Sequence, residues 1–330
     1  MKSHFSFEEK MRLANATADA LYDAFANLKL SEPQLIANLV SEFPKHLNAI
    51  RLSGTTKIKA GGVFVHARPF VTCSSFPKPS PKSVEIGDLL LIRTLVVSGK
   101  VEERRALLLQ AKKADRIPVT PDNQNQWHLY ERWPRFTYAS RSGSLTGKSR
   151  CIKAPDMYDA AKYLLIGSEH TLLNGPYMYW RDWPLYLIAH WPEVFIHYTA
   201  QPTKPEISRY KTFADELVEF LVGNAGKVFD TPKPRTRGWN QVIYDLLNET
   251  AKAKTIFMER AVGSKAKSTR GSGVFFCKFA NQADYLLVAD TEDSEGDNFN
   301  IPPEVPIEWS EDGDGGGISI LEFIVEQAEG

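Results

Sequence analysis

Residues 85–115, EIGDLLLIRTLVVSGKVEERRALLLQAKKAD, place two largely apolar runs on either side of the turn-forming residues SGK. The runs LLLI and ALLL lack polar alternation, which predicts two antiparallel strands that are buried on both faces. If a three-residue turn is centred on Gly99, antiparallel pairing places Asp88 opposite Gln110. Lys112 then projects from the same face as Gln110. A turn centred one residue later would place Asp88 opposite Lys112, so in either register the polar groups meet at one end of the hairpin.

An acid and an amide in one place are suited to bind a divalent cation, and an ammonium beside them is suited to act on a water at that cation. Mg²⁺ prefers hard oxygen ligands and retains several waters. The Asp88 carboxylate, the Gln110 amide oxygen and the Ala111 backbone carbonyl are candidate ligands, and Lys112 would orient or deprotonate an attacking water. The alternative is an ordinary ion pair between Asp88 and Lys112 at the strand ends.

Regular elements flank this hairpin in a defined order. Residue periodicity and cap signals predict helices over 6–29 and 31–43, with Ser31 as N-cap and Pro33 in the first turn. A strand is expected over 61–73, a short helix over 122–133 and a strand over 135–139. The first part therefore reads α-β-β-β-α-β. In the second half we expect helices near 156–166, 210–222 and 238–252, and strands at 274–279, 285–289 and 318–325.

This order resembles the PD-(D/E)xK nuclease superfamily, whose shared core is αβββαβ. Residues IGD (86–88) and QAK (110–112) stand where the family has its metal-binding Asp and its E/QxK motif. QWHLY (126–130) is similar to the QxxxY motif of RecB-like and lambda-exonuclease-like members. Two positions depart from the family pattern: Ile86 replaces a proline, and the neutral Gln110 replaces a carboxylate.

The resemblance covers residues 31–140 and implies an α/β fold with a mixed central sheet and a restriction-endonuclease-like core. Residues 1–30 would then form an N-terminal helical extension, and residues 141–330 a C-terminal α/β region. Glu85 is a candidate for partial substitution of the missing carboxylate. Strand parity directs it away from Asp88, unless the chain at Glu85 is still a loop.

The resemblance also implies a cytoplasmic, Mg²⁺- or Mn²⁺-dependent deoxyribonuclease. A helical acid would complete the metal ligands Asp88, Gln110 and Ala111. Glu32 and Glu42 are the candidates for this acid, and we favour Glu32. Bacterial nucleases of this type often act in defence against foreign DNA, and only the resemblance suggests that role here.

Substrate contacts are expected from two regions. In the family, the residues that match Gln126 and Tyr130 lie beside the active site and help to position DNA. The basic, small-residue-rich segment 141–153 offers Arg141, Lys148 and Arg150 as phosphate ligands, or else is a solvated loop. His66, on the strand predicted over 61–73, is a further candidate, although a half-buried strand histidine is the simpler interpretation.

The formal net charge of zero hides an asymmetry along the chain. From Asp284 to the end there are 14 acidic residues and no Lys or Arg, so 40 basic and 26 acidic residues remain in the rest. Such an asymmetry suggests a polyanionic partner, although acidic loops also serve solubility. The Gly- and Pro-rich acidic segment 290–317 is expected to be a long mobile loop that covers a basic face as a phosphate mimic.

Other sequence features limit the class of protein. The three scattered cysteines fit a reducing compartment, no apolar run is long enough for a membrane span, and the N-terminus lacks the apolar region of a signal peptide. DNA is the expected partner, and the sequence leaves room for a protein partner and a homo-oligomer. The rival hypothesis is a catalytically degenerate nuclease-fold module, with Gln110 as the lost ligand, that binds nucleic acid or protein.

Overall fold

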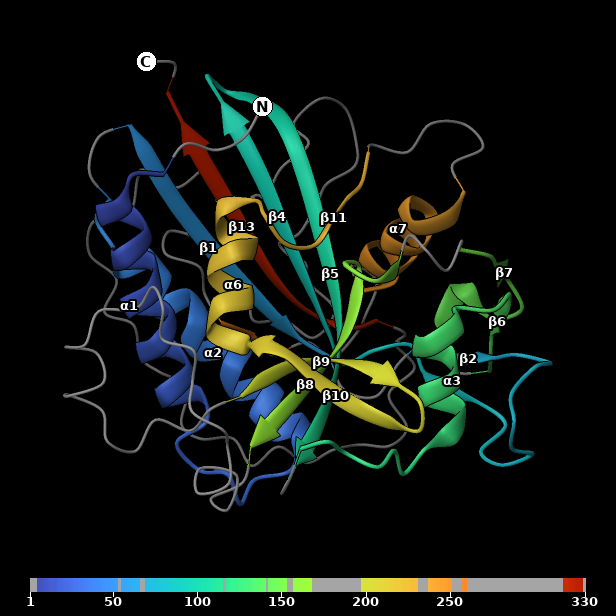
Figure 1. The fold of residues 1–330 in the computed structure, drawn as a ribbon. Coiled ribbons are helices and arrows are strands. Elements are labelled where there is room, and N and C mark those ends of the chain that lie inside the picture. The colour runs from blue at the N-terminus through green and yellow to red at the C-terminus, as the bar shows by residue number, and fades with distance from the viewer. Residues whose placement is uncertain are drawn as a thin grey trace.

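The computed structural model describes residues 5–52, 55–65, 69–114, 117–140, 142–152, 157–167, 197–230, 237–250, 257–259 and 317–328. Within these residues the chain is an α/β protein with a mixed central sheet and a smaller antiparallel sheet (Figure 1). No helix in the described part of the chain is long and apolar enough to cross a membrane.

The main sheet gathers strands from both halves of the chain. Its members are β1 (Thr56–Phe64), β4 (Leu89–Val97), β5 (Lys100–Ala114), β8 (Ala161–Gly167), β9 (Tyr198–Thr203), β10 (Glu206–Thr212), β11 (Lys227–Val228), β12 (Phe257–Glu259) and β13 (Ser319–Gln327). They are ordered β10-β9-β8-β5-β4-β13-β1-β12, and β11 pairs with β5. β13 runs parallel to β4 and antiparallel to β1, so the end of the chain lies inside this sheet.

The predicted hairpin forms the middle of the sheet, and its predicted register is correct next to Asp88. Leu89 pairs with Leu109, as a turn centred on Gly99 requires. The turn itself is tighter than predicted, because Val97 pairs with Lys100 and a bulge after Leu95 absorbs one residue. Ser98 and Gly99 both have positive φ, at 48° and 77°, which suits a two-residue hairpin turn.

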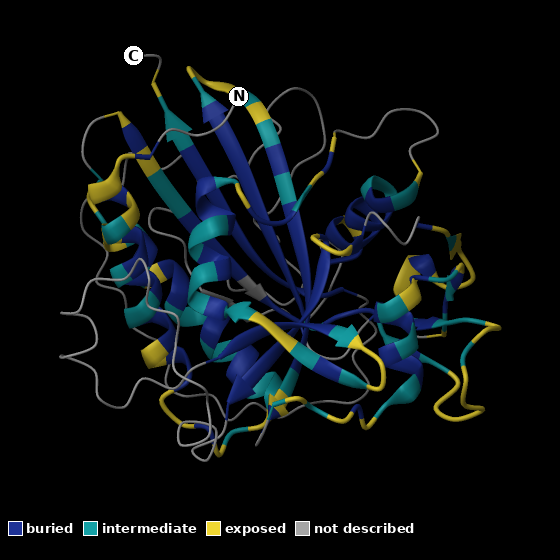
Figure 2. Ribbon diagram, viewed as in Figure 1, coloured by how far each residue is buried: buried dark blue, intermediate teal, exposed yellow. Residues whose placement is uncertain are grey.

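Helices cover both faces of the hairpin, which explains why residues 89–92 and 106–109 are apolar and buried without alternation (Figure 2). On one face, α1 (Phe7–Ala24), α2 (Glu32–Ala49) and α6 (Phe213–Val222) pack against Leu89, Leu91, Leu107 and Leu109. On the other face, α3 (Gln124–Arg132), α7 (Gly238–Thr250) and the smaller sheet pack against Leu90, Ile92 and Leu108. The predicted cap of α2 is present: the Ser31 N–H donates to Gln34 Oε1 at 3.0 Å, and Pro33 lies in the first turn.

The smaller sheet consists of β2 (Phe70–Thr72), β3 (Val84–Glu85), β6 (Phe136–Tyr138) and β7 (Ser149–Arg150), in the order β3-β2-β6-β7. It corrects one prediction: residues 61–73 are not one strand, because β1 belongs to the main sheet and β2 to the smaller one. The strand predicted over 135–139 exists as β6, but it also lies in the smaller sheet. The strand parallel to β5 is instead β8.

The helix predicted near 156–166 is wrong, because residues 161–167 form β8. Every residue of β8 is buried, and a strand buried on both faces has no period-two pattern to distinguish it from a buried helix. The helices predicted over 210–222 and 238–252 correspond to α6 and α7, and the strand over 318–325 to β13. The strands at 274–279 and 285–289, the acidic segment 290–316, His66 and Arg141 lie outside the described residues.

Candidate functional site

Asp88 lies where the chain enters the main sheet. Its backbone N–H donates to the Leu109 carbonyl at 2.9 Å, the last ladder bond at this end of the hairpin. Its carboxylate accepts hydrogen bonds from the Gln110 side-chain amide and, at 2.7 Å, from the Ala111 N–H. The structure therefore brings Asp88, Gln110 and Ala111 together, as the register predicted.

Glu32 reaches the same edge of β5 from the first turn of α2. Its carboxylate accepts the Lys113 backbone N–H at 2.7 Å. Two residues of a strand span about 6.6 Å, so Asp88 and Glu32 occupy successive positions along one edge. In an extended strand the N–H and C=O of one residue point to the same side, so the Ala111 carbonyl faces the space between these two carboxylates. Of the two helical acids considered, only Glu32 is at this site.

Glu85 is a further acid at the site, and strand parity made us discount it. It ends β3 in the smaller sheet, and the connecting residues 86–88 are not strand, so alternation from Asp88 does not apply. Burial raises the pKa of Glu85, and its hydrogen bond to Asp88 acts in the opposite direction. Burial and the nearby Glu85 raise the pKa of Asp88 well above its usual range, while the Ala111 N–H lowers it. The sequence could have identified Glu85 only if residues 86–88 had been read as a loop, because strand alternation does not apply across a loop.

Lys112 supplies the cation of the site. It extends from β5 on the same face as Gln110, and its ammonium lies 3.7 Å from Asp122 Oδ1, just before α3. After the larger effects of burial and neighbouring carboxylates, the Lys112 charge lowers the pKa of both Asp88 and Glu85. The ammonium is therefore near enough to act on whatever these acids bind.

The glycine of the IGD sequence is required by packing. A Cβ at Gly87 would lie 2.7 Å from the Leu108 side chain and 3.1 Å from the Tyr130 hydroxyl. That hydroxyl donates to the Ile86 carbonyl at 2.9 Å. Tyr130 is buried, and its hydrogen bond holds the loop that presents Asp88. The sequence resemblance had suggested that Tyr130 contacts the substrate. Gln126 lies one turn earlier on α3 and is also buried.

Of the basic residues predicted to bind phosphate, Lys148 and Arg150 are described, and they belong to the smaller sheet, farther from Asp88. Lys148 is exposed beside β7. Arg150 in β7 is engaged within the protein, because its guanidinium donates to both carboxylate oxygens of Asp245 in α7, one of them at 3.0 Å. β7 and β3 are at opposite edges of the four-stranded sheet, so Arg150 and Glu85 are separated by about three strand spacings, roughly 14 Å.

The donor atoms near Asp88 are oxygens, the kind that a hard divalent cation takes. Glu32 and Glu85 are near enough to influence the pKa of Asp88, although among the described residues these three acids do not form a group whose ligand atoms all lie within 4.8 Å of one another. The Gln110 side chain, which contacts Asp88, adds an amide oxygen. That oxygen is buried and has no hydrogen-bond partner among the described residues, since the amide nitrogen of the same side chain is the group that contacts Asp88. Buried polar atoms are almost always satisfied, so this oxygen is a candidate partner for a water or a cation.

No family model, curated protein or solved structure matches this chain.

Proposed function

We propose that this protein is a Mg²⁺- or Mn²⁺-dependent nuclease with a restriction-endonuclease-like core. The observation that carries the proposal is the convergence of Asp88, Glu32, Gln110 and Lys112 at one edge of β5. These residues come from three separate stretches of the chain, and each belongs to the sequence pattern that resembles the PD-(D/E)xK superfamily.

The topology supports this core in a modified form. The elements α2, β1, β4, β5, α3 and β8 occur in the order αβββαβ once the strands of the smaller sheet, which lie between β1 and β4 and between α3 and β8, are set aside. β4 is antiparallel and β8 parallel to β5. The modification is β13, which lies between β1 and β4 and so separates two strands of that core. The main sheet also continues past residue 140, since β8, β9 and β10 extend it beyond β5.

The proposed metal ligands are the carboxylates of Asp88 and Glu32, the Ala111 carbonyl and the Gln110 amide oxygen. Glu85 is the acid available in place of the carboxylate that Gln110 lacks. Its hydrogen bond to Asp88 requires a proton on one of the two carboxyl groups, and metal binding would displace that proton. A bound Mg²⁺ would lower the pKa of a coordinated water and offset charge on the scissile phosphate.

The chain's own residues supply the remaining chemistry. Lys112 orients the attacking water and stabilises the negative charge that develops on the phosphate. Tyr130 and Gly87 keep the loop before Asp88 in place, so that the carboxylate is fixed before substrate binds. The N-terminus of α2 holds Glu32 at the β5 edge through the Lys113 N–H.

A cleavage assay tests the proposal. Wild type, Asp88→Ala and Lys112→Ala would be incubated with linear, circular and single-stranded DNA and with RNA, in Mg²⁺ or Mn²⁺. We expect metal-dependent cleavage by wild type only, with both variants folded by circular dichroism. Equal cleavage by all three proteins would rule out this site.

A binding module without catalysis is the second candidate, and a specific observation favours it. The Asp88 carboxylate accepts two hydrogen bonds from within the protein, from Gln110 and Ala111, so it can serve as a structural element of the strand end. Salt-sensitive DNA binding without cleavage in either metal would select this function.

A further inference from the structure

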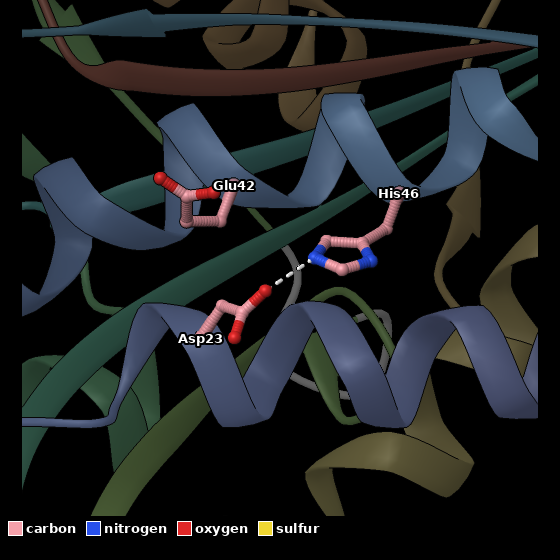
Figure 3. Close-up of side chains that lie close together, drawn as sticks. All are labelled: Asp23, Glu42 and His46. Carbon is pink, nitrogen blue, oxygen red and sulfur yellow. Dashed lines mark hydrogen bonds and ion pairs between the residues drawn. The ribbon is translucent and has the colours of Figure 1, made fainter.

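The α1–α2 hairpin carries a second cluster of potential metal ligands. Glu42 and His46 are four residues apart on α2 and so lie on one side of it, and Asp23 faces them from α1 (Figure 3). Their ligand atoms all lie within 4.8 Å of one another. Ten residues of helix separate Glu42 from Glu32, a rise of about 15 Å, so this cluster is distinct from the candidate active site.

The cluster has more acid than its neighbours neutralise. His46 Nε2 lies 2.7 Å from Asp23 Oδ2, and Lys45 Nζ lies 3.0 Å from Glu42 Oε1. A third carboxylate, Asp19, is one turn before Asp23 on α1. Burial raises its pKa, His46 lowers it and Asp23 raises it again, so Asp19 lies within the electrostatic reach of the cluster.

The mixed donor set discriminates between metals. An imidazole nitrogen with carboxylate oxygens favours Zn²⁺ and similar transition metals, whereas Mg²⁺ and Ca²⁺ prefer oxygen alone. Ligand atoms about 2.1 Å from a tetrahedral Zn²⁺ are about 3.4 Å apart. The side chains of Asp23 and His46 are 48% and 26% exposed, so small rotamer changes can bring these atoms to that spacing.

We propose that Asp23, Glu42 and His46 bind one transition-metal dication, best matched by Zn²⁺, which clips α1 to α2. Water completes the coordination, and Asp19 adds negative charge behind the ligands. Because α2 begins at Glu32, the clip fixes the helix that reaches the β5 edge. The proposal does not depend on whether the protein cleaves nucleic acid.

Zn²⁺ titration of the full chain, freed of metal with a chelator and followed by calorimetry, tests the site. Since loss of an outer-shell partner alone costs about 10- to 100-fold in metal affinity, we expect His46→Gln to weaken Zn²⁺ binding by about 100-fold or more. His128→Gln is the matched control, because His128 is a partly buried histidine on α3, away from the cluster. Asp88→Asn should leave this binding event intact.

A second variant gives a change in the opposite direction. Lys45→Met removes the ammonium that pairs with Glu42, so Zn²⁺ should bind more tightly than in wild type. An unchanged or weaker affinity in Lys45→Met would overturn the three-residue site. So would Zn²⁺ binding that His46→Gln leaves intact, or a wild type that binds no Zn²⁺. None of these three results bears on Mg²⁺ binding at Asp88.

Discussion

Two polar clusters lie on opposite faces of the main sheet beside the β5–β8 pair, and they differ in how their hydrogen-bonding groups are satisfied. The first is buried, and the second is half-buried. The first joins β8 to α6: Lys162 Nζ lies 2.6 Å from Glu216 Oε1, and both side chains are almost fully buried. Thr199 and Lys211 approach the other Glu216 oxygen at 3.5 and 3.6 Å, and the Lys162 ammonium lies 4.5 Å from the Tyr210 ring centroid. The charged groups of Lys162 and Glu216 therefore find their partners within this cluster.

The second cluster, around Asp88, has the opposite character. Asp88 and Glu85 are adjacent acids whose pKa values are raised, chiefly by burial, and the Gln110 amide oxygen has no partner among the described residues. Such an arrangement costs stability unless something binds it. The comparison teaches that a buried ion pair whose groups satisfy each other needs no ligand, whereas neighbouring acids beside an unsatisfied oxygen are candidates for a binding site.

The largest expected effect is on activity. Asp88→Asn removes a charged ligand while its side-chain oxygen can still accept the Ala111 N–H. A bound metal supplies several kcal/mol of transition-state stabilisation, so we expect single-turnover cleavage to fall by about 1000-fold. The matched control is Asp122→Asn, which removes a carboxylate near Lys112 and should retain most activity. Cleavage by Asp88→Asn at the wild-type rate would contradict the assignment.

The next largest effect is on the free energy of unfolding, and it concerns the cluster around Lys162 and Glu216. Glu216→Ala leaves Lys162 buried without its counter-ion and should cost about 3–5 kcal/mol in urea unfolding, because an uncompensated buried charge is strongly destabilising. The double variant Lys162→Met, Glu216→Leu should recover most of this loss. A loss below about 1 kcal/mol, the level of a surface ion pair, would mean that the pair is not a structural element.

Gly87→Ala should affect both properties. The added Cβ would overlap the Leu108 side chain and crowd the Tyr130 hydroxyl, so we expect a loss of about 1–3 kcal/mol in stability and displacement of Asp88. Cleavage should fall more than stability explains, measured at a temperature where the variant is fully folded. Gly147→Asn, at an open position with positive φ, is the control that should retain activity.

The smallest effect is a pH dependence of stability in the absence of metal. Because the folded-state pKa values of Glu85 and Asp88 are raised, the folded state holds their protons more tightly than the unfolded state. Their contribution to stability is therefore present at low pH and declines as the pH rises through the folded-state pKa values. Glu85→Gln should be the more stable protein at neutral pH, with the difference shrinking toward pH 4. A difference that grows as the pH falls would have the wrong sign.

The sequence predicts the site better than it predicts the sheet around it. The pairing of Asp88 with Gln110 depends on local register, which the apolar runs and the SGK turn determine even with a bulge. The sequence favoured Glu32 over Glu42 as the helical acid near Asp88. It could not predict that Glu32 contacts β5, because this contact depends on how α2 packs against the sheet. The insertion of β13 beside β4 was out of reach, because it pairs residues more than 200 positions apart, such as Leu89 and Ser319. Glu85 was discounted because strand alternation was applied to residues that form a loop.

The most direct test of the central claim is calorimetric titration of metal-free protein with Mg²⁺ and Mn²⁺, for wild type and Asp88→Asn. We predict that wild type binds the metal with release of protons, since metal binding requires its carboxylate ligands in the deprotonated form. Asp88→Asn should show neither the binding nor the proton release at this site. Absence of Mg²⁺ and Mn²⁺ binding by folded wild type, or equal binding by both proteins, would contradict the account.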